Sequence, residues 1–124
     1  MLFAGLDVGS ITTKVAIIND NKILYRIEAT GWSPQTTGRN AYISLLNQMG
    51  FSQGQVRCVV GTGYGRISLP FVDKAITEIT CHARGASYLV PDSTIVIDIG
   101  GQDSKVISID RHGQVLDFVM NDKC

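Results

Sequence analysis

The chain has 124 residues, of which 44% are hydrophobic, and its 11 basic side chains balance its 11 acidic ones. This length and composition suffice to bury the core of one ordinary domain. No basic run gives an electrostatic footprint for nucleic acid, and no apolar stretch reaches the roughly 18 residues of a membrane-spanning helix. No secretory signal is found either, so we expect a cytoplasmic protein with no nucleic-acid or membrane partner.

The sequence contains three cysteines, Cys58, Cys81 and Cys124, with no CxxC pair. In the absence of a secretory signal, an odd number of cysteines predicts reduced thiols rather than a disulfide framework. Cys58 and Cys81 are expected to be core or half-buried thiols. The chain stops on "MNDKC" with no element after its final strand, so we expect a fragment of a longer protein.

In chain order, the first elements form a predicted β-meander, with strands at about 2–8, 13–19 and 22–30. Trp32 follows in a loop and is expected to be a packed aromatic. Apolar residues at three- and four-residue spacing predict an amphipathic helix over 39–49. A strand over 56–61 then leads into the glycine-rich loop "GTGYGR" at 61–66.

The segment after this loop is ambiguous, because its β-branched residues favour a strand while its apolar spacing also fits a helix. We expect a short strand at 75–79, with Thr80 as the N-cap of a helix that runs to about Leu89. Three more strands are predicted, at about 94–99, 104–110 and 114–119. This order of elements is typical of an α/β fold with a mixed sheet.

The stretches "LDVGSITTKV" and "IDIGGQDSKV" have the same form, in which a strand ends on an aspartate and is followed by a glycine and a lysine. A shift of 91 positions aligns them with five identities, which are Asp7 with Asp98, Gly9 with Gly100, Lys14 with Lys105, Val15 with Val106 and Ile18 with Ile109. The repeat predicts two lobes that begin with the same strand–turn–strand unit. We expect the first lobe at 1–92 and the truncated start of the second at 93–124.

Such a unit can bind phosphate, because a tight turn of glycine and hydroxyl residues can point N–H and O–H groups at phosphate oxygens. The expected phosphate contacts are Gly9, Ser10, Ile11, Thr12, Thr13, Lys14, Gly100, Gly101, Gln102 and Asp103. The aspartates Asp7 and Asp98 are expected to meet the Mg²⁺ of a nucleotide through its water molecules. The alternative is that both stretches are only turn chemistry, although finding the pattern twice favours the phosphate interpretation.

Glu78 is one of only two glutamates and precedes the predicted second helix. It is placed to polarise a water molecule for attack on a terminal phosphate, and a capping or surface role fits equally well. His82 lies beside Cys81, but adjacent helix residues point in different directions, so no metal pair is predicted.

The stretches "LDVGS", "GTGYGR", "EITCHARGA", "VIDIGGQDSKV" and "MNDKC" together resemble the activator ATPases of 2-hydroxyacyl-CoA dehydratases, which are grouped with the ATPase subunits of benzoyl-CoA reductase. The resemblance runs along the whole chain and corresponds to the N-terminal half of the family. It implies the α/β, ribonuclease H-like fold of the actin, sugar kinase and heat-shock chaperone superfold. In such actin-like ATPases a carboxylate or amide at the position of Glu78 often lies near the attacking water, which places Glu78 with Asp7 and Asp98 among the expected catalytic residues.

The resemblance also implies an electron-delivery protein that uses ATP and Mg²⁺. A homodimer of the full-length protein would hold one [4Fe-4S] cluster between its subunits, and Cys124 matches the first of the two cysteine ligands that each subunit gives. The electron would come from a donor such as ferredoxin or flavodoxin and pass to a 2-hydroxyacyl-CoA dehydratase or related reductase component. The 124-residue piece alone is expected to be inactive.

Two other functions are compatible with the residues. A sugar or acyl kinase of the same superfold would use Asp98 as its catalytic aspartate, although the short first lobe leaves little room for a sugar. A non-catalytic fragment that only folds or assembles is the other alternative.

Overall fold

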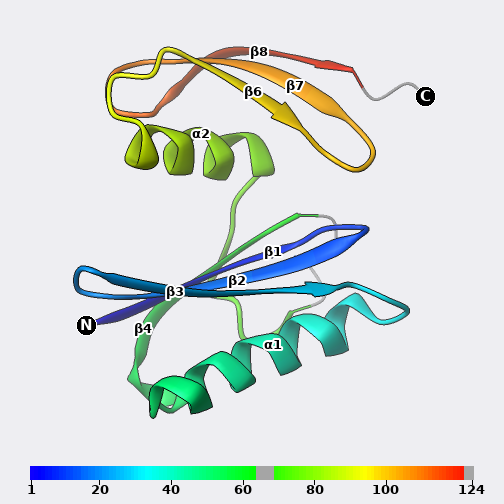
Figure 1. The fold of residues 1–124 in the computed structure, drawn as a ribbon, viewed down its shortest axis with the longest axis vertical. Helices are drawn as coiled ribbons and strands as arrows, with labels where there is room; N and C mark the ends of the chain where they lie inside the picture. The colour runs from blue at the N-terminus through cyan, green and yellow to red at the C-terminus, as the bar shows by residue number, and fades with distance from the viewer. Residues whose placement is uncertain (64–68, 122–124) are drawn as a thin grey trace. The chain divides into compact units, whose positions relative to one another are not determined.

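The computed structural model describes residues 1–63 and 69–121 of the chain. The chain divides into two compact units, Met1–Ile76 and Thr77–Cys124, each with its own sheet (Figure 1). Each unit also has its own hydrophobic core. No helix in the described ranges is both long and apolar enough to cross a lipid bilayer.

The first unit is built on a five-stranded sheet in the order β3-β2-β1-β4-β5. Its strands are β1 (Leu2–Val8), β2 (Thr12–Asn19), β3 (Lys22–Ala29), β4 (Val56–Thr62) and β5 (Lys74–Ala75). The strand β1 pairs antiparallel with β2 and parallel with β4, so the sheet is mixed, as predicted. The predicted meander is confirmed, and β4 lies within one residue of the range expected for it.

The helix α1 (Pro34–Met49) covers one face of this sheet and forms the core of the first unit (Figure 1). Side chains alternate along β1, so that Leu2, Ala4, Leu6 and Val8 are all buried beneath the helix. On the helix, Tyr42 is buried and stacks on Phe71 at a ring-centroid distance of 5.0 Å.

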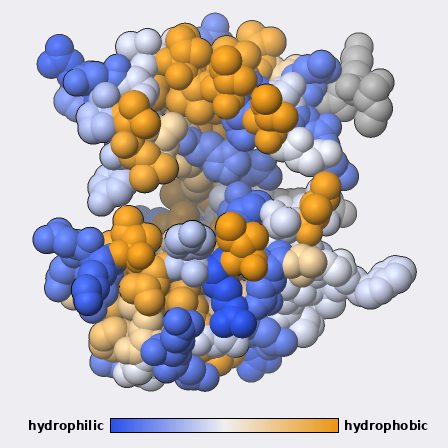
Figure 2. Space-filling view, viewed as in Figure 1, coloured by the Kyte–Doolittle hydropathy of each residue, from blue (hydrophilic) through white to orange (hydrophobic). Residues whose placement is uncertain are grey.

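The second unit consists of the helix α2 (Glu78–Leu89) and a three-stranded antiparallel sheet of β6 (Ile95–Ile99), β7 (Ser104–Ile109) and β8 (Val115–Asn121). Ala83 of α2 packs on Ile107 and Ile109 of β7, and all three side chains are buried. The other face of the sheet carries exposed apolar side chains, which gather over the strands of this unit in Figure 2. They include Ile95, Ile97, Ile99, Val106 and Val119.

Both helices begin earlier than predicted. α1 starts at Pro34 rather than residue 39, because Ser33 caps it by accepting a hydrogen bond from the Thr36 N–H at 3.3 Å, and proline suits the first turn. The predicted strand at 75–79 is wrong beyond Ala75, since α2 begins at Glu78 with Thr77 rather than Thr80 as its N-cap. The helical spacing of Ile79 and Ala83, which pack on the second sheet, prevails over β-branched propensity.

Packing also groups α2 with the second sheet, so the compact units divide after Ile76, whereas the repeat placed the lobe boundary after residue 92. The two divisions differ because the repeat covers only the strands, while the contacts of α2 are made with β6, β7 and β8.

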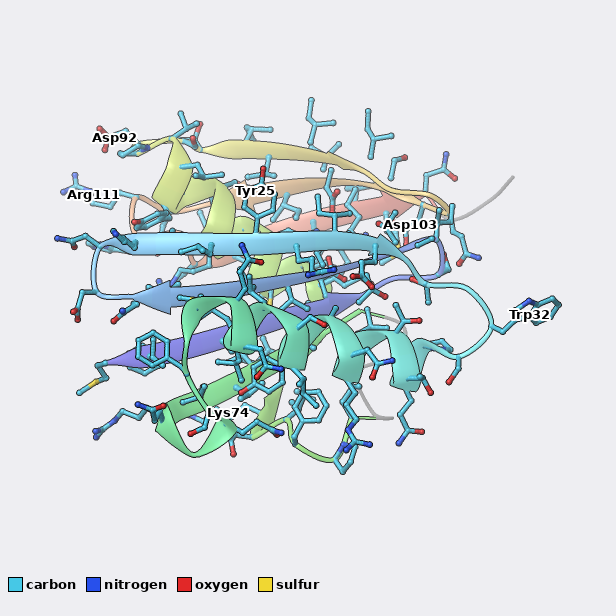
Figure 3. The ribbon with its side chains drawn as sticks, turned by 60° about the horizontal axis from the view of Figure 1, so that its bottom comes forward. Tyr25, Trp32, Lys74, Asp92, Asp103 and Arg111 are labelled. Atoms are coloured by element: carbon cyan, nitrogen blue, oxygen red, sulfur yellow. The ribbon has the colours of Figure 1, made fainter. Side chains whose placement is uncertain are left out.

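The expectation that Trp32 packs in its loop is wrong. Its side chain is fully exposed and projects outward from the connection between β3 and α1 (Figure 3). Of the "GTGYGR" loop, residues 64–66 lie outside the described ranges.

Candidate functional site

The first hairpin joins β1 to β2 at residues 9–11, and its turn is closed by the Gly9 N–H, which donates to the Thr12 carbonyl oxygen at 2.9 Å. Asp7 and Lys14 lie directly opposite each other across the two strands, with Lys14 Nζ at 3.5 Å from Asp7 Oδ2. The side chains of Ser10 and Ile11 at the tip are exposed. The hairpin therefore presents a carboxylate, an ammonium group and a glycine turn at the ends of two neighbouring strands.

A buried threonine that the sequence analysis did not single out holds this hairpin in shape. The Thr30 hydroxyl donates to the Gly9 carbonyl oxygen at 2.8 Å and accepts from the Thr13 hydroxyl at 2.9 Å, since one hydroxyl has only one proton to give. The Thr30 N–H donates to the Ile11 carbonyl oxygen, and its own carbonyl accepts from the Thr37 hydroxyl of α1. The Thr13 hydroxyl is thus already hydrogen-bonded within the protein. A phosphate contact made by Thr13 stays a prediction, and it would involve the backbone of this residue.

The tip of β4 also approaches the first hairpin. A Cβ atom added at Gly63 would stand 2.6 Å from both Asp7 Oδ1 and the Val8 carbonyl oxygen, and Gly63 has a φ of +90°. Only glycine allows so close an approach and this backbone conformation. Gly63 of "GTGYGR" therefore has a positional role next to Asp7.

The second hairpin repeats the geometry of the first, which confirms the repeat at the level of individual bonds. The Gly100 N–H donates to the Asp103 carbonyl oxygen at 2.8 Å, and Asp98 lies directly opposite Lys105. Gly101 and Gln102 are exposed, and Figure 3 shows Asp103 at the turn between β6 and β7. That the two hairpins hold one phosphate chain together stays a prediction.

The lysines of the two hairpins differ in environment. The Lys14 side chain is 41% exposed, whereas that of Lys105 is only 4% exposed and faces three carboxylates. Lys105 Nζ lies 2.7 Å from Asp103 Oδ1, 3.4 Å from Glu78 Oε2 and 3.7 Å from Asp98 Oδ2. Burial lowers the pKa of Lys105, but the hydrogen bond to Asp103 and the three negative charges outweigh it, so the pKa is raised.

Glu78 is the first residue of α2, rather than a strand residue as predicted, and its carboxylate pairs with Lys105. A negative charge is stabilised at a helix N-terminus by the helix dipole. The structure thus brings Glu78 together with Asp98, Asp103 and Lys105 within the second unit. That Glu78 polarises a water molecule for attack on a phosphate stays a prediction.

His82 joins the same cluster, although the sequence analysis set it aside. His82 Nδ1 lies 2.5 Å from Asp98 Oδ2. The signal that could have found it is the four-residue spacing from Glu78, which places both side chains on one face of α2.

The metal-ligating side chains of the described residues determine which metal ions the site can hold. These residues contain no group of three or more His, Cys, Asp or Glu side chains that could hold a metal ion. Mg²⁺ keeps several waters and needs only one or two carboxylates when a nucleotide supplies phosphate oxygens, so the strand-tip aspartates fit a magnesium ion that arrives with a nucleotide. Within the described residues, Cys58 and Cys81 are not joined in a disulfide, and Cys124 lies outside those residues.

Comparison with solved structures defines the class of fold. The structure superposes with a TM-score of 0.92 on component A of the (R)-2-hydroxyglutaryl-CoA dehydratase of Acidaminococcus fermentans, with 37% sequence identity, over 100% of this chain and 48% of that chain. It superposes with a TM-score of 0.89 on the activator of the 2-hydroxyisocaproyl-CoA dehydratase from Clostridium difficile with bound ADPNP, with 38% identity, over 100% of this chain and 47% of that one. The fold is thus the α/β, ribonuclease H-like fold of actin-like ATPases, as predicted.

Sequence comparison then identifies the family. The chain belongs to the BadF/BadG/BcrA/BcrD ATPase family, whose profile matches residues 4–124. A curated relative, the 2-hydroxyisocaproyl-CoA dehydratase activator of Clostridioides difficile, is 39% identical over 125 residues, which cover 100% of this chain and 47% of the relative. The chain therefore spans about half the length of the relatives it matches.

Replacing Thr30 by valine tests the support of the first hairpin. Thr30→Val keeps the side-chain shape but leaves the half-buried Gly9 carbonyl and the buried Thr13 hydroxyl without this partner. We predict a loss of about 1–3 kcal/mol in the free energy of unfolding, measured by chemical denaturation, together with faster amide exchange at Gly9. The same change at the exposed Thr94 should be nearly neutral, and equal effects at the two sites would contradict the assignment.

Lys105 predicts a pH dependence of stability. Because the folded-state pKa of Lys105 is raised above its ordinary value of 10.5, its stabilising effect is complete below that pH and is lost as pH rises through the raised pKa. The difference in unfolding free energy between the wild-type protein and Lys105→Met should therefore be largest near neutral pH and narrow above about pH 10.5.

Lys14→Met is the matched control, and it should cost only about 0–1 kcal/mol because the Lys14 pair is solvent-screened. A difference between the wild-type protein and Lys105→Met that stays constant or widens in alkaline solution would contradict the buried pairing.

Proposed function

We propose that this chain is the N-terminal part of an ATP-dependent activator that delivers a low-potential electron to a 2-hydroxyacyl-CoA dehydratase or a related reductase. The observation that carries the proposal is the repeated hairpin, with the same closing hydrogen bond and the same aspartate–lysine pair in both units. Membership of an ATPase family and the ADPNP bound to a structural relative support it.

ATP is the proposed ligand of the two hairpins. The exposed residues at the two turns would face phosphate oxygens, and Lys14 is exposed enough to reach them. These turn residues are Ser10, Ile11, Gly101 and Gln102. Lys105 instead sits among carboxylates and stabilises the fold of its hairpin. Asp7 and Asp98 would hold Mg²⁺ through its waters, and the ion would neutralise charge on the phosphates.

Glu78 is the proposed residue that orients the attacking water. Its carboxylate is 31% exposed, so one side pairs with Lys105 while the other can accept a hydrogen bond from water. The Lys105 ammonium group and the N-terminus of α2 hold this carboxylate in place, and a carboxylate oxygen can accept a hydrogen bond from a water molecule.

The redox part of the proposal concerns Cys124. A [4Fe-4S] cluster needs four thiolates, and a homodimer in which each subunit gives Cys124 and a second cysteine from the rest of the polypeptide supplies them. The cluster would supply the electron, taken from a ferredoxin or flavodoxin in the cytoplasm and passed to the partner enzyme.

Iron analysis of the complete polypeptide, purified without oxygen, tests the proposal. We predict about two iron and two acid-labile sulfide atoms per subunit in a dimer, since one four-iron cluster is shared by two chains. Cys124→Ser should abolish the iron, whereas Cys58→Ser, at a strand thiol, should retain it. A wild-type protein without iron after anaerobic reconstitution, or a Cys124→Ser variant with full iron, would contradict the proposal.

A further inference from the structure

The aspartate at the tip of β6, Asp98, is supported from outside its own hairpin. Asp98 accepts a hydrogen bond from a histidine, His82, which has no counterpart in the strand–turn–strand repeat because it comes from α2. A carboxylate oxygen accepts hydrogen bonds, so the histidine tautomer that makes this bond is the one with its proton on Nδ1.

Within the second unit, the described contacts of the Asp98 carboxylate fall on one of its two oxygens. Oδ2 accepts from His82 Nδ1 at 2.5 Å and lies 3.7 Å from Lys105 Nζ. The hydrogen bonds of Lys105 go instead to Asp103 and Glu78. Among the described contacts, His82 therefore makes the hydrogen bond to the Asp98 carboxylate, and Oδ1 is the oxygen left to face a ligand.

The bond is not needed to hold α2 on its sheet. Ile79 and Ala83 pack α2 against the apolar side chains of the second core. The guanidinium of Arg84 also donates to the carbonyl oxygen of His112 at 2.8 Å, which ties the helix to the turn between β7 and β8. Loss of the His82 bond would thus free the carboxylate of Asp98 while leaving the helix in place.

We propose that His82 is a positioning residue that turns the Asp98 carboxylate so that Oδ1 faces the magnesium ion accompanying a nucleotide. This inference rests on the proposed nucleotide function. It assigns to α2 a part in cation binding that the two hairpins alone do not provide. Partners that orient a metal-binding carboxylate typically change metal affinity by about 10–100-fold when removed.

The test measures ADPNP binding to the complete polypeptide by calorimetry, with and without Mg²⁺, for the wild-type protein, His82→Leu and His82→Asn. Leucine removes the donor, whereas the asparagine amide nitrogen is as many bonds from the backbone as Nδ1 and restores it. Mg²⁺ is expected to raise the affinity of the wild-type protein for ADPNP, and His82→Leu should reduce this increase by about 10–100-fold. The affinity for ADPNP without Mg²⁺ should be unchanged. His82→Asn should recover most of that gain.

Arg84→Leu is the matched control, because it removes another polar tie of α2 without touching Asp98. It should retain the full effect of Mg²⁺, and thermal unfolding of all variants shows whether they are folded. The inference is overturned if His82→Leu keeps the full gain, if His82→Asn loses as much as His82→Leu, or if Arg84→Leu loses as much.

The wild-type protein separates this inference from the proposed function. If it does not bind ADPNP with Mg²⁺, both are overturned. If it binds ADPNP equally well with and without Mg²⁺, the role of His82 is overturned and nucleotide binding stands.

Discussion

One backbone hydrogen bond, from a glycine N–H to the carbonyl oxygen three residues later, closes each of the two hairpins on which the rest of the site depends. It is 2.9 Å long at Gly9 and 2.8 Å long at Gly100. Once the turn is closed in this way, the antiparallel register places the preceding aspartate opposite the following lysine. A single local constraint therefore brings a carboxylate, an ammonium group and an accessible glycine turn to the same strand tip in each unit.

The two units stabilise this arrangement by different physical means. In the first unit neutral hydroxyl groups do so, because Thr30 connects the Gly9 carbonyl, the Thr13 hydroxyl and the helix α1. In the second unit charges do so, because the ammonium group of Lys105 is nearly buried among three carboxylates. Charged groups removed from water are costly to leave unpaired, so the second hairpin tolerates fewer changes than the first.

The sequence allowed much of this to be predicted. The repeat located Asp7, Asp98 and the two lysines, because their positions relative to the turn glycine are fixed by strand geometry. Thr30 was missed because its partner Gly9 lies 21 residues away, and no spacing rule connects residues so distant. His82 was set aside because it was weighed only against its neighbour Cys81, whereas its partner Asp98 lies 16 residues away. The start of α2 was misplaced because a β-branched run has strand propensity, while packing of the helix on the second sheet decides the outcome.

The central claim is that the glycine turn of the first hairpin binds nucleotide phosphates. It is tested most directly by measuring Mg²⁺–ADPNP affinity in the complete polypeptide carrying Gly9→Ala or Gly5→Ala. A Cβ at Gly9 would stand 2.8 Å from the Thr12 carbonyl oxygen, whereas at Gly5, on the same strand, it meets nothing within 4 Å. The account predicts that Gly9→Ala weakens binding by about 10–100-fold and that Gly5→Ala binds as the wild-type protein does. Equal affinity in all three proteins would contradict it.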